Sequence, residues 1–244
     1  TIFALALVFI VIGRARPQFG SKLKEVTRTG IEMMLAVDVS NSMLAQDFEP
    51  SRLERTKFAI DRLTQQLEQD RIGLIVFDGD AYMQLPITSD YVAARSFAAQ
   101  ISPTMVSKQG TAIGAAIDLA ASSFSSGSEG SRVIVVISDG ENHEDDALAA
   151  AKAAAEKGIR IYTIGIGTPE GAPISIDGEF IKDEQGDMVV SKLDEQMLEQ
   201  IALTTGGAYI RATNRSLGLD EIVQKINEVE KKELTSTVFE DFNE

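Results

Sequence analysis

Short apolar runs alternate along this chain with segments of helical periodicity. The runs that predict buried strands are 31–39, 71–77, 132–138 and 159–167. Strands that stay apolar along most of their length are typical of a parallel sheet covered on both faces. We therefore expect an α/β fold, with a doubly wound, mostly parallel sheet and helices on both faces.

The segments between these runs carry helix signals. Ser51 stands three residues before Glu54, which predicts a capping box, and apolar residues then follow on one face of a helix. Further helices are expected at 90–101, 112–125, 144–157, 194–204 and 218–233, with one more strand at 207–212.

Two segments depart from the alternation. The run 81–87 contains Pro86, which is tolerated in an edge strand, so we expect an antiparallel strand at one edge of the sheet. Residues 169–191 contain two prolines and several turns made of an acidic residue and glycine. They predict a hairpin inserted into the domain.

Composition excludes several classes of function. The formal net charge of −14 argues against nucleic-acid binding, because phosphate contacts require a basic surface. The absence of cysteine removes thiolate metal sites, and the single histidine, His143, leaves little room for a zinc site or a Ser-His-Asp triad. An acidic chain is compatible with binding a divalent cation.

The amino terminus is uniformly apolar over residues 1–12. A helix needs about 20 such residues to span a bilayer, so we interpret 1–12 as part of a transmembrane helix and 13–30 as a linker. A signal-peptide core or a buried first element are the alternatives. We assign the folded domain to 31–234, and 235–244 to a linker toward a further transmembrane helix.

Small oxygen-bearing side chains stand where strands and helices meet. Asp38, Ser40 and Ser42 follow one strand with a period of two, Asp139 follows another, and Thr111 opens a helix. The carboxyl ends of parallel strands meet at the ligand-binding edge of such a sheet, so these side chains are expected to converge. Hydroxyl and carboxylate oxygens suit Mg²⁺, Mn²⁺ or Ca²⁺.

Each of these residues also has a simpler interpretation. Asp38, Ser40 and Ser42 could cap a turn, Thr111 could cap its helix, and Asp139 before a glycine could be a turn residue. The acidic residues 144–146 are expected to favour the start of the helix 144–157 through its dipole.

The arrangement resembles von Willebrand factor type A (VWA) domains over residues 31–230. Asp38-Val39-Ser40-Asn41-Ser42 matches the DxSxS motif of that family, and Thr111 and Asp139 match its two remaining positions. The resemblance implies a Rossmann-like fold and a metal-ion-dependent adhesion site. It also implies that Ser40, Ser42 and Thr111 ligate the metal, and that Asp38 and Asp139 act largely through water.

Further stretches resemble the bacterial membrane-anchored aerotolerance (Bat) proteins. They are "ARPQFG", "FDGDAYMQLPITSD", "FIKDEQGDMVVSKLDE" and "TGGAYIRAT". This resemblance implies a domain anchored in the bacterial inner membrane and exposed to the periplasm. By analogy it also implies other membrane VWA proteins or a MoxR-type AAA+ ATPase as partners.

We therefore expect a non-enzymatic protein-binding domain that depends on a divalent cation, with Mg²⁺ preferred. Its partner would supply a carboxylate to the metal. A Mg²⁺-dependent hydrolase is the first alternative, but Ser40 stands where such an enzyme would carry a second aspartate. A scaffold that acts without metal is the second alternative.

Overall fold

A six-stranded sheet forms the centre of the computed structural model, which describes residues 30–124, 131–142, 144–176 and 178–228. The strand order is β10-β5-β4-β1-β2-β3. Their bounds are Glu32–Asp38 (β1), Arg71–Phe77 (β2), Ala81–Thr88 (β3), Arg132–Ser138 (β4), Arg160–Gly165 (β5) and Tyr209–Arg211 (β10).

All neighbouring strands are parallel except β2 and β3. Strand β3 is antiparallel to β2 at the edge of the sheet, and its pairing shifts register on either side of Leu74. Pro86 is exposed there, where its missing N–H costs no internal hydrogen bond. The prediction of a mostly parallel sheet with one antiparallel edge strand is confirmed.

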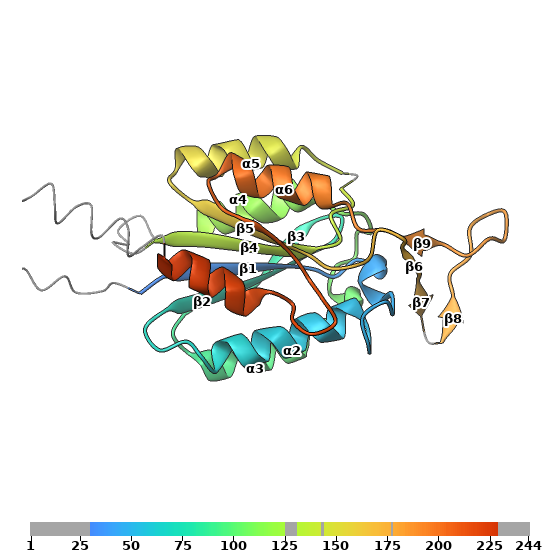
Figure 1. The fold of residues 1–244 in the computed structure, drawn as a ribbon, viewed down its shortest axis with the longest axis horizontal. Coiled ribbons are helices and arrows are strands. Elements are labelled where there is room, and N and C mark those ends of the chain that lie inside the picture. Colours follow the sequence, from blue (N-terminus) through green and yellow to red (C-terminus); the bar gives the residue numbers. More distant parts are fainter. Residues whose placement is uncertain (1–29, 125–130, 143, 177, 229–244) are drawn as a thin grey trace, which may run out of the picture.

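The helices cover both faces of the sheet (Figure 1). One face carries α2 and α3 together with a last helix described over 219–228, and the other carries α4, α5 and α6. The bounds are Arg52–Thr64 (α2), Tyr91–Ala99 (α3), Ile113–Ser123 (α4), Ala147–Glu156 (α5) and Glu195–Thr204 (α6).

Strand β1 shows why the sheet must be covered on both sides. Met33, Leu35 and Val37 pack in the core beneath α2 and α3, whereas Met34 and Ala36 pack in the core beneath α4 and α5. Successive side chains of a strand point to opposite faces, so an apolar strand needs a helical layer on each side.

The segment 169–191 contains two small antiparallel pairs in place of a helix. Strand β6 (Ala172–Pro173) pairs with β9 (Val190–Ser191), and between them β7 (Ser175–Ile176) pairs with β8 (Glu179–Phe180). Figure 1 shows this insertion projecting beyond the ends of β1 and β4. We refer to residues 169–191 as the insertion.

Helix α5 begins later than the sequence indicates. It starts at Ala147, and Asp146 caps it by accepting a hydrogen bond from the backbone N–H of Ala149. The two preceding acidic residues belong to the loop instead: Glu144 pairs with Lys108, and Asp145 bonds to another helix.

The expected membrane segment 1–12, most of the linker 13–30, His143 and the expected linker 235–244 lie outside the described residues. Within the described part of the chain, every helix is too short or too polar to cross a bilayer.

Candidate metal centre

The predicted residues come together where the strand order reverses. The chain continues from β1 to β2 on one side and reaches β4 on the other side, so the switch point lies at the carboxyl ends of β1 and β4. Asp38 is the last residue of β1, and Asp139 directly follows β4. Both side chains are fully buried.

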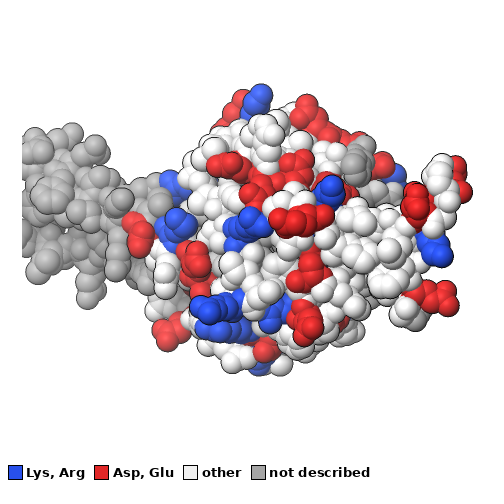
Figure 2. All heavy atoms as spheres, turned by 45° about the vertical axis from the view of Figure 1, so that its right-hand side comes forward, with Lys and Arg blue, Asp and Glu red and all other residues white. Residues whose placement is uncertain are grey.

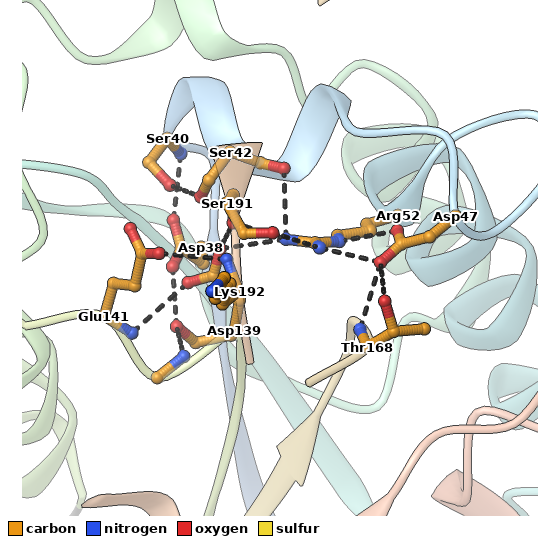
Figure 3. Close-up of polar contacts among 12 residues, drawn as sticks. Asp38, Ser40, Ser42, Asp47, Arg52, Asp139, Glu141, Thr168, Ser191 and Lys192 are labelled. Atoms are coloured by element: carbon orange, nitrogen blue, oxygen red, sulfur yellow. Dashed lines mark hydrogen bonds and ion pairs between the residues drawn. The ribbon is translucent and has the colours of Figure 1, made fainter. Parts of the chain in front are cut away.

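The loop after β1 turns its polar groups toward one another (Figure 3). The backbone N–H of Ser40 donates to Asp38 Oδ1 at 2.9 Å, which bends the chain back over the carboxylate. The hydroxyl oxygens of Ser40 and Ser42 are 2.8 Å apart. A short 3₁₀ helix, η1 (Asn41–Leu44), fixes this arrangement immediately after Ser40.

The second oxygen of Asp38 is held from β4. Ser138 donates its hydroxyl to Asp38 Oδ2 at 2.6 Å and accepts the backbone N–H of Gly140 at 2.9 Å. Ser138 therefore bridges the ends of the two strands. The sequence analysis did not identify Ser138 as a site residue, although its place directly before Asp139 was a usable signal.

Two buried carboxylates at this edge repel each other. Burial raises the pKa of Asp38 to about 7, and the nearby charge of Asp139 adds to the rise, while hydrogen bonds from Ser138 and Ser40 oppose it. A divalent cation would remove this penalty, because it would neutralise both carboxylates at once. The electrostatics and the donor atoms thus fit a cation.

Thr111 reaches the same edge through other contacts. Its backbone neighbours are tied to the end of β2, because Gly110 N–H donates to Asp78 Oδ1 and Ala112 N–H donates to Asp78 O. The Thr111 hydroxyl donates to Gly110 O at 2.7 Å, and among the described contacts no donor occupies the lone pairs of its oxygen. Thr111 itself is almost fully buried.

Helix α4, which follows Thr111, is capped by residues from a different segment. Its N-cap residue, Ala112, provides no capping side chain. Asp145 accepts from the N–H groups of Gly114 and Ala115 at 3.0 and 2.7 Å, and Asn142 accepts from Ile113 N–H at 3.2 Å. The loop after Asp139 thus fixes the position of Thr111.

Hydroxyl groups are essential to this donor set. Among the described residues no three His, Cys, Asp or Glu side chains lie close enough together to hold a metal by themselves. A cation at this edge would need Ser40, Ser42 and Thr111 in addition to the two aspartates. Such a donor set suits a hard cation such as Mg²⁺.

Arg52 is a further site residue that the sequence did not indicate. It is the first residue of α2, and its side chain is fully buried against Asp139, Asp47 and Ser191 (Figure 3). An arginine at a helix start usually faces solvent, so the sequence carries no signal of its burial. The sequence did not indicate Ser191 either, because it lies 52 residues after Asp139.

The outer surface carries charges of both signs. Figure 2 shows Lys and Arg side chains interspersed among more numerous Asp and Glu side chains on the face that it presents. This distribution agrees with the net charge of −14.

Comparison with known proteins identifies the family to which the fold belongs. The model of the von Willebrand factor type A domain matches residues 32–225, which is most of the chain. The chain belongs to the von Willebrand factor type A domain family. The predicted resemblance to this family is confirmed.

Two solved structures support the resemblance to the Bat proteins. An aerotolerance-related membrane protein from Bacteroides fragilis is 51% identical with a TM-score of 0.78, and covers 82% of this chain and all of its own. BatB from Bacteroides thetaiotaomicron is 50% identical with a TM-score of 0.79, and covers 83% of this chain and all of its own.

More distant proteins share the fold alone. Proximal thread matrix protein 1 of the mussel byssus is 15% identical with a TM-score of 0.60, over 83% of this chain and 46% of its own, and its structure has a zinc-occupied metal-ion-dependent adhesion site.

The chain spans 60–68% of the length of the first curated relatives that it matches. They include a UPF0353 protein of Mycolicibacterium paratuberculosis that is 27% identical over 239 residues.

Proposed function

We propose that this chain is a non-enzymatic protein-binding domain that requires a divalent cation. One observation carries the proposal: two fully buried aspartates, Asp38 and Asp139, lie at the switch point of the sheet beside the paired hydroxyls of Ser40 and Ser42. Buried like charges are costly unless cations compensate them, and Arg52 beside Asp139 also pairs with Asp47. A divalent cation would supply the remaining positive charge.

The residues have distinct roles in this proposal. Ser40, Ser42 and Thr111 would hold the cation directly, and Asp38 and Asp139 would act through its water ligands. Mg²⁺ is preferred because it keeps several waters and needs few direct protein ligands; Mn²⁺ and Ca²⁺ are the alternatives. The zinc-occupied site of the mussel protein supports a divalent cation at this position in the fold.

The partner is a protein that presents a carboxylate. When bound, the cation supplies an electrophilic position that such a group fills. Because Ser40, Ser42 and Thr111 would contribute neutral hydroxyls, the cation would keep surplus positive charge, which would favour an anionic ligand from a partner. Other membrane VWA proteins and a MoxR-type AAA+ ATPase are the candidates that the family likeness suggests.

The proposed place of action is the bacterial inner membrane, with this domain on the periplasmic side. The name of the Bacteroides fragilis relative, an aerotolerance-related membrane protein, supports a membrane setting. A reporter fused after Glu244 tests the orientation, because a cytoplasmic signal would contradict the periplasmic assignment.

Calorimetric titration of Mg²⁺, Mn²⁺ and Ca²⁺ tests the metal site. The parent protein is expected to bind at least Mg²⁺ saturably, and Asp38→Ala is expected to lose this binding while circular dichroism shows a folded domain. Asp118→Ala, an exposed aspartate on α4, is the matched control and should bind as the parent does. Equal binding by all three proteins would contradict the assignment.

Binding to candidate partners separates the proposal from its alternatives. An interaction that EDTA abolishes and Mg²⁺ restores supports metal-dependent recognition, whereas an interaction that EDTA leaves unchanged supports a metal-independent scaffold. Turnover of a phosphatase substrate that disappears in Asp38→Ala would support the hydrolase instead.

A further inference from the structure

The guanidinium of Arg52 lies between three segments that are distant in the sequence. It is 0% exposed, whereas Arg62 on the same helix is 71% exposed. Asp47 binds it with both carboxylate oxygens, at 2.8 and 2.7 Å. This bidentate pair fixes the plane of the guanidinium and leaves Nη1 directed at the metal centre.

Nη1 reaches three places: the loop after β1 (residues 39–44), which we call the metal loop, the end of β4, and the insertion. It donates to Asp139 Oδ2 at 3.1 Å, to Ser191 Oγ at 2.7 Å and to Ser42 O at 3.4 Å. Nη2 adds a bond to Ser191 O at 3.3 Å. Figure 3 shows these contacts radiating from the one side chain.

Gly167 makes room for the guanidinium of Arg52 because it has no side chain. A Cβ at Gly167 would lie 3.0 Å from the guanidinium carbon and from Nη2, and Gly167 has φ +141°, which L-residues rarely adopt. The chain that leads from β5 into the insertion thus packs directly on Arg52. Next to it, Thr168 donates its N–H and its hydroxyl to Asp47 Oδ2.

Ser191, at the carboxyl end of the insertion, contacts both Arg52 and Asp139. It is the last residue of β9 and is buried, and its hydroxyl donates to Asp139 Oδ2 at 2.8 Å. Oδ2 of Asp139 is therefore engaged by Arg52 and Ser191. Oδ1 accepts only a long 3.3 Å bond from Glu141 N–H among the described contacts, so it is the freer oxygen for a hydrated cation.

We infer that Arg52 is a positioning residue that orients Asp139 and docks the insertion against the metal centre, so that cation binding and docking of the insertion stabilise each other. This inference rests on the proposed metal-dependent function. The coupling is reciprocal by thermodynamic linkage: if docking favours the cation by a given factor, the cation favours docking by the same factor.

The docked insertion also shapes the surface beside the metal. A groove of about 500 Å³ is lined by Asn41 and Leu44 after β1, by Ser175 and Ile176 of the insertion, and by several residues of the segment 103–109. Coupling through Arg52 would therefore let the cation set the shape of a surface adjoining the place where a partner carboxylate binds.

Hydrogen exchange with Mg²⁺ as the only added ligand tests the inference. The reporters are the amides of Ile174, Ile181 and Val189, which are bonded within the insertion. In the parent protein, Mg²⁺ is expected to slow their exchange. Arg52→Gln and Ser191→Ala should exchange faster without Mg²⁺, should lose the response to Mg²⁺, and should bind Mg²⁺ about tenfold more weakly.

Arg62→Gln, an exposed arginine of α2, is the matched control and should behave as the parent does. Ser191→Ala carries the test if Arg52→Gln fails to fold, because it removes one hydroxyl and leaves the charges balanced. Mg²⁺ binding in the parent with unchanged exchange of the insertion, or a Ser191→Ala variant indistinguishable from the parent, overturns the inference alone. Absence of Mg²⁺ binding in the parent overturns the proposed function and this inference with it.

Discussion

The carboxyl group of Asp38 links two segments of the site and has a raised pKa. Its oxygens accept the N–H of Ser40 and the hydroxyl of Ser138, which join the metal loop to β4. Its burial beside Asp139 raises its pKa to about 7. In the metal-free protein this carboxyl group therefore takes up a proton near neutral pH, so the proton and the cation compete for it.

The competition predicts a pH dependence of Mg²⁺ affinity. Below pH 7 the affinity is expected to fall by up to about tenfold per pH unit, because the cation must displace one proton from Asp38. Calorimetry at pH 6, 7 and 8 measures this change. The same affinity at pH 6 and pH 8 would contradict the raised pKa of Asp38.

The raised pKa also makes the stability of the metal-free fold depend on pH. The folded-state pKa of Asp38 lies above the ordinary 3.8, so the contribution of Asp38 to the free energy of unfolding is fully present below about pH 4 and is lost as pH rises through 7. Asp38→Asn, which cannot ionise, should lack this loss of stability in chemical denaturation without metal.

At the scale of elements, the loop between β4 and α5 fixes the start of α4. Asp145 accepts from the N–H groups of Gly114 and Ala115, although it stands next to the start of a different helix. Asp146, its neighbour, caps α5 by accepting from Ala149 N–H at 3.0 Å. Adjacent aspartates thus cap two different helices, and only one of those helices begins beside Thr111.

Asp145 and Asp146 allow a matched experiment, because each caps a different helix. Asp145→Ala and Asp146→Ala are each expected to lower the free energy of unfolding by about 1 kcal/mol, because each removes a helix cap. Only Asp145→Ala should also weaken Mg²⁺ binding, since it releases the start of the helix that Thr111 precedes. Chemical denaturation and calorimetry measure the two effects; equal Mg²⁺ affinities in both variants would show that α4 does not position the site.

For the whole molecule, the cation would join parts that are distant in the sequence. The metal loop follows β1, Asp139 follows β4, and Thr111 precedes α4. These groups converge only in the folded state, so a cation that needs all of them binds the folded protein and not the unfolded chain. Such binding stabilises the fold by mass action.

Mg²⁺ at about 100 times its dissociation constant is expected to raise the free energy of unfolding by about 2.7 kcal/mol. For a domain of this size the melting temperature should rise by about 5–10 °C, which calorimetric or optical melting measures. NaCl at matched ionic strength is the necessary control, because any salt screens a chain of net charge −14. Stabilisation of Asp38→Ala to the same extent would indicate screening and not a site.

The sequence alone determined the architecture. Apolar runs such as 132–138 must be covered on both faces, which favours parallel strands joined by helices, and Pro86 indicated the antiparallel edge. The spacing of Asp38, Ser40 and Ser42 predicted that their side chains converge, although only Asp38 lies in a strand and Ser42 lies in the 3₁₀ helix η1. These signals are local, because they depend on the period of the backbone and on the chemistry of neighbouring residues.

Only the tertiary structure decided how the centre is held. The burial of Arg52, its contact with Ser191 and the capping of α4 by Asp145 join residues 30 to 139 positions apart. A buried ion pair and a cap from another segment depend on how the elements pack, and not on the residues beside them in the chain. The sequence therefore named a candidate set of metal-binding residues, whereas the packing of α2, α4 and the insertion determined their orientation.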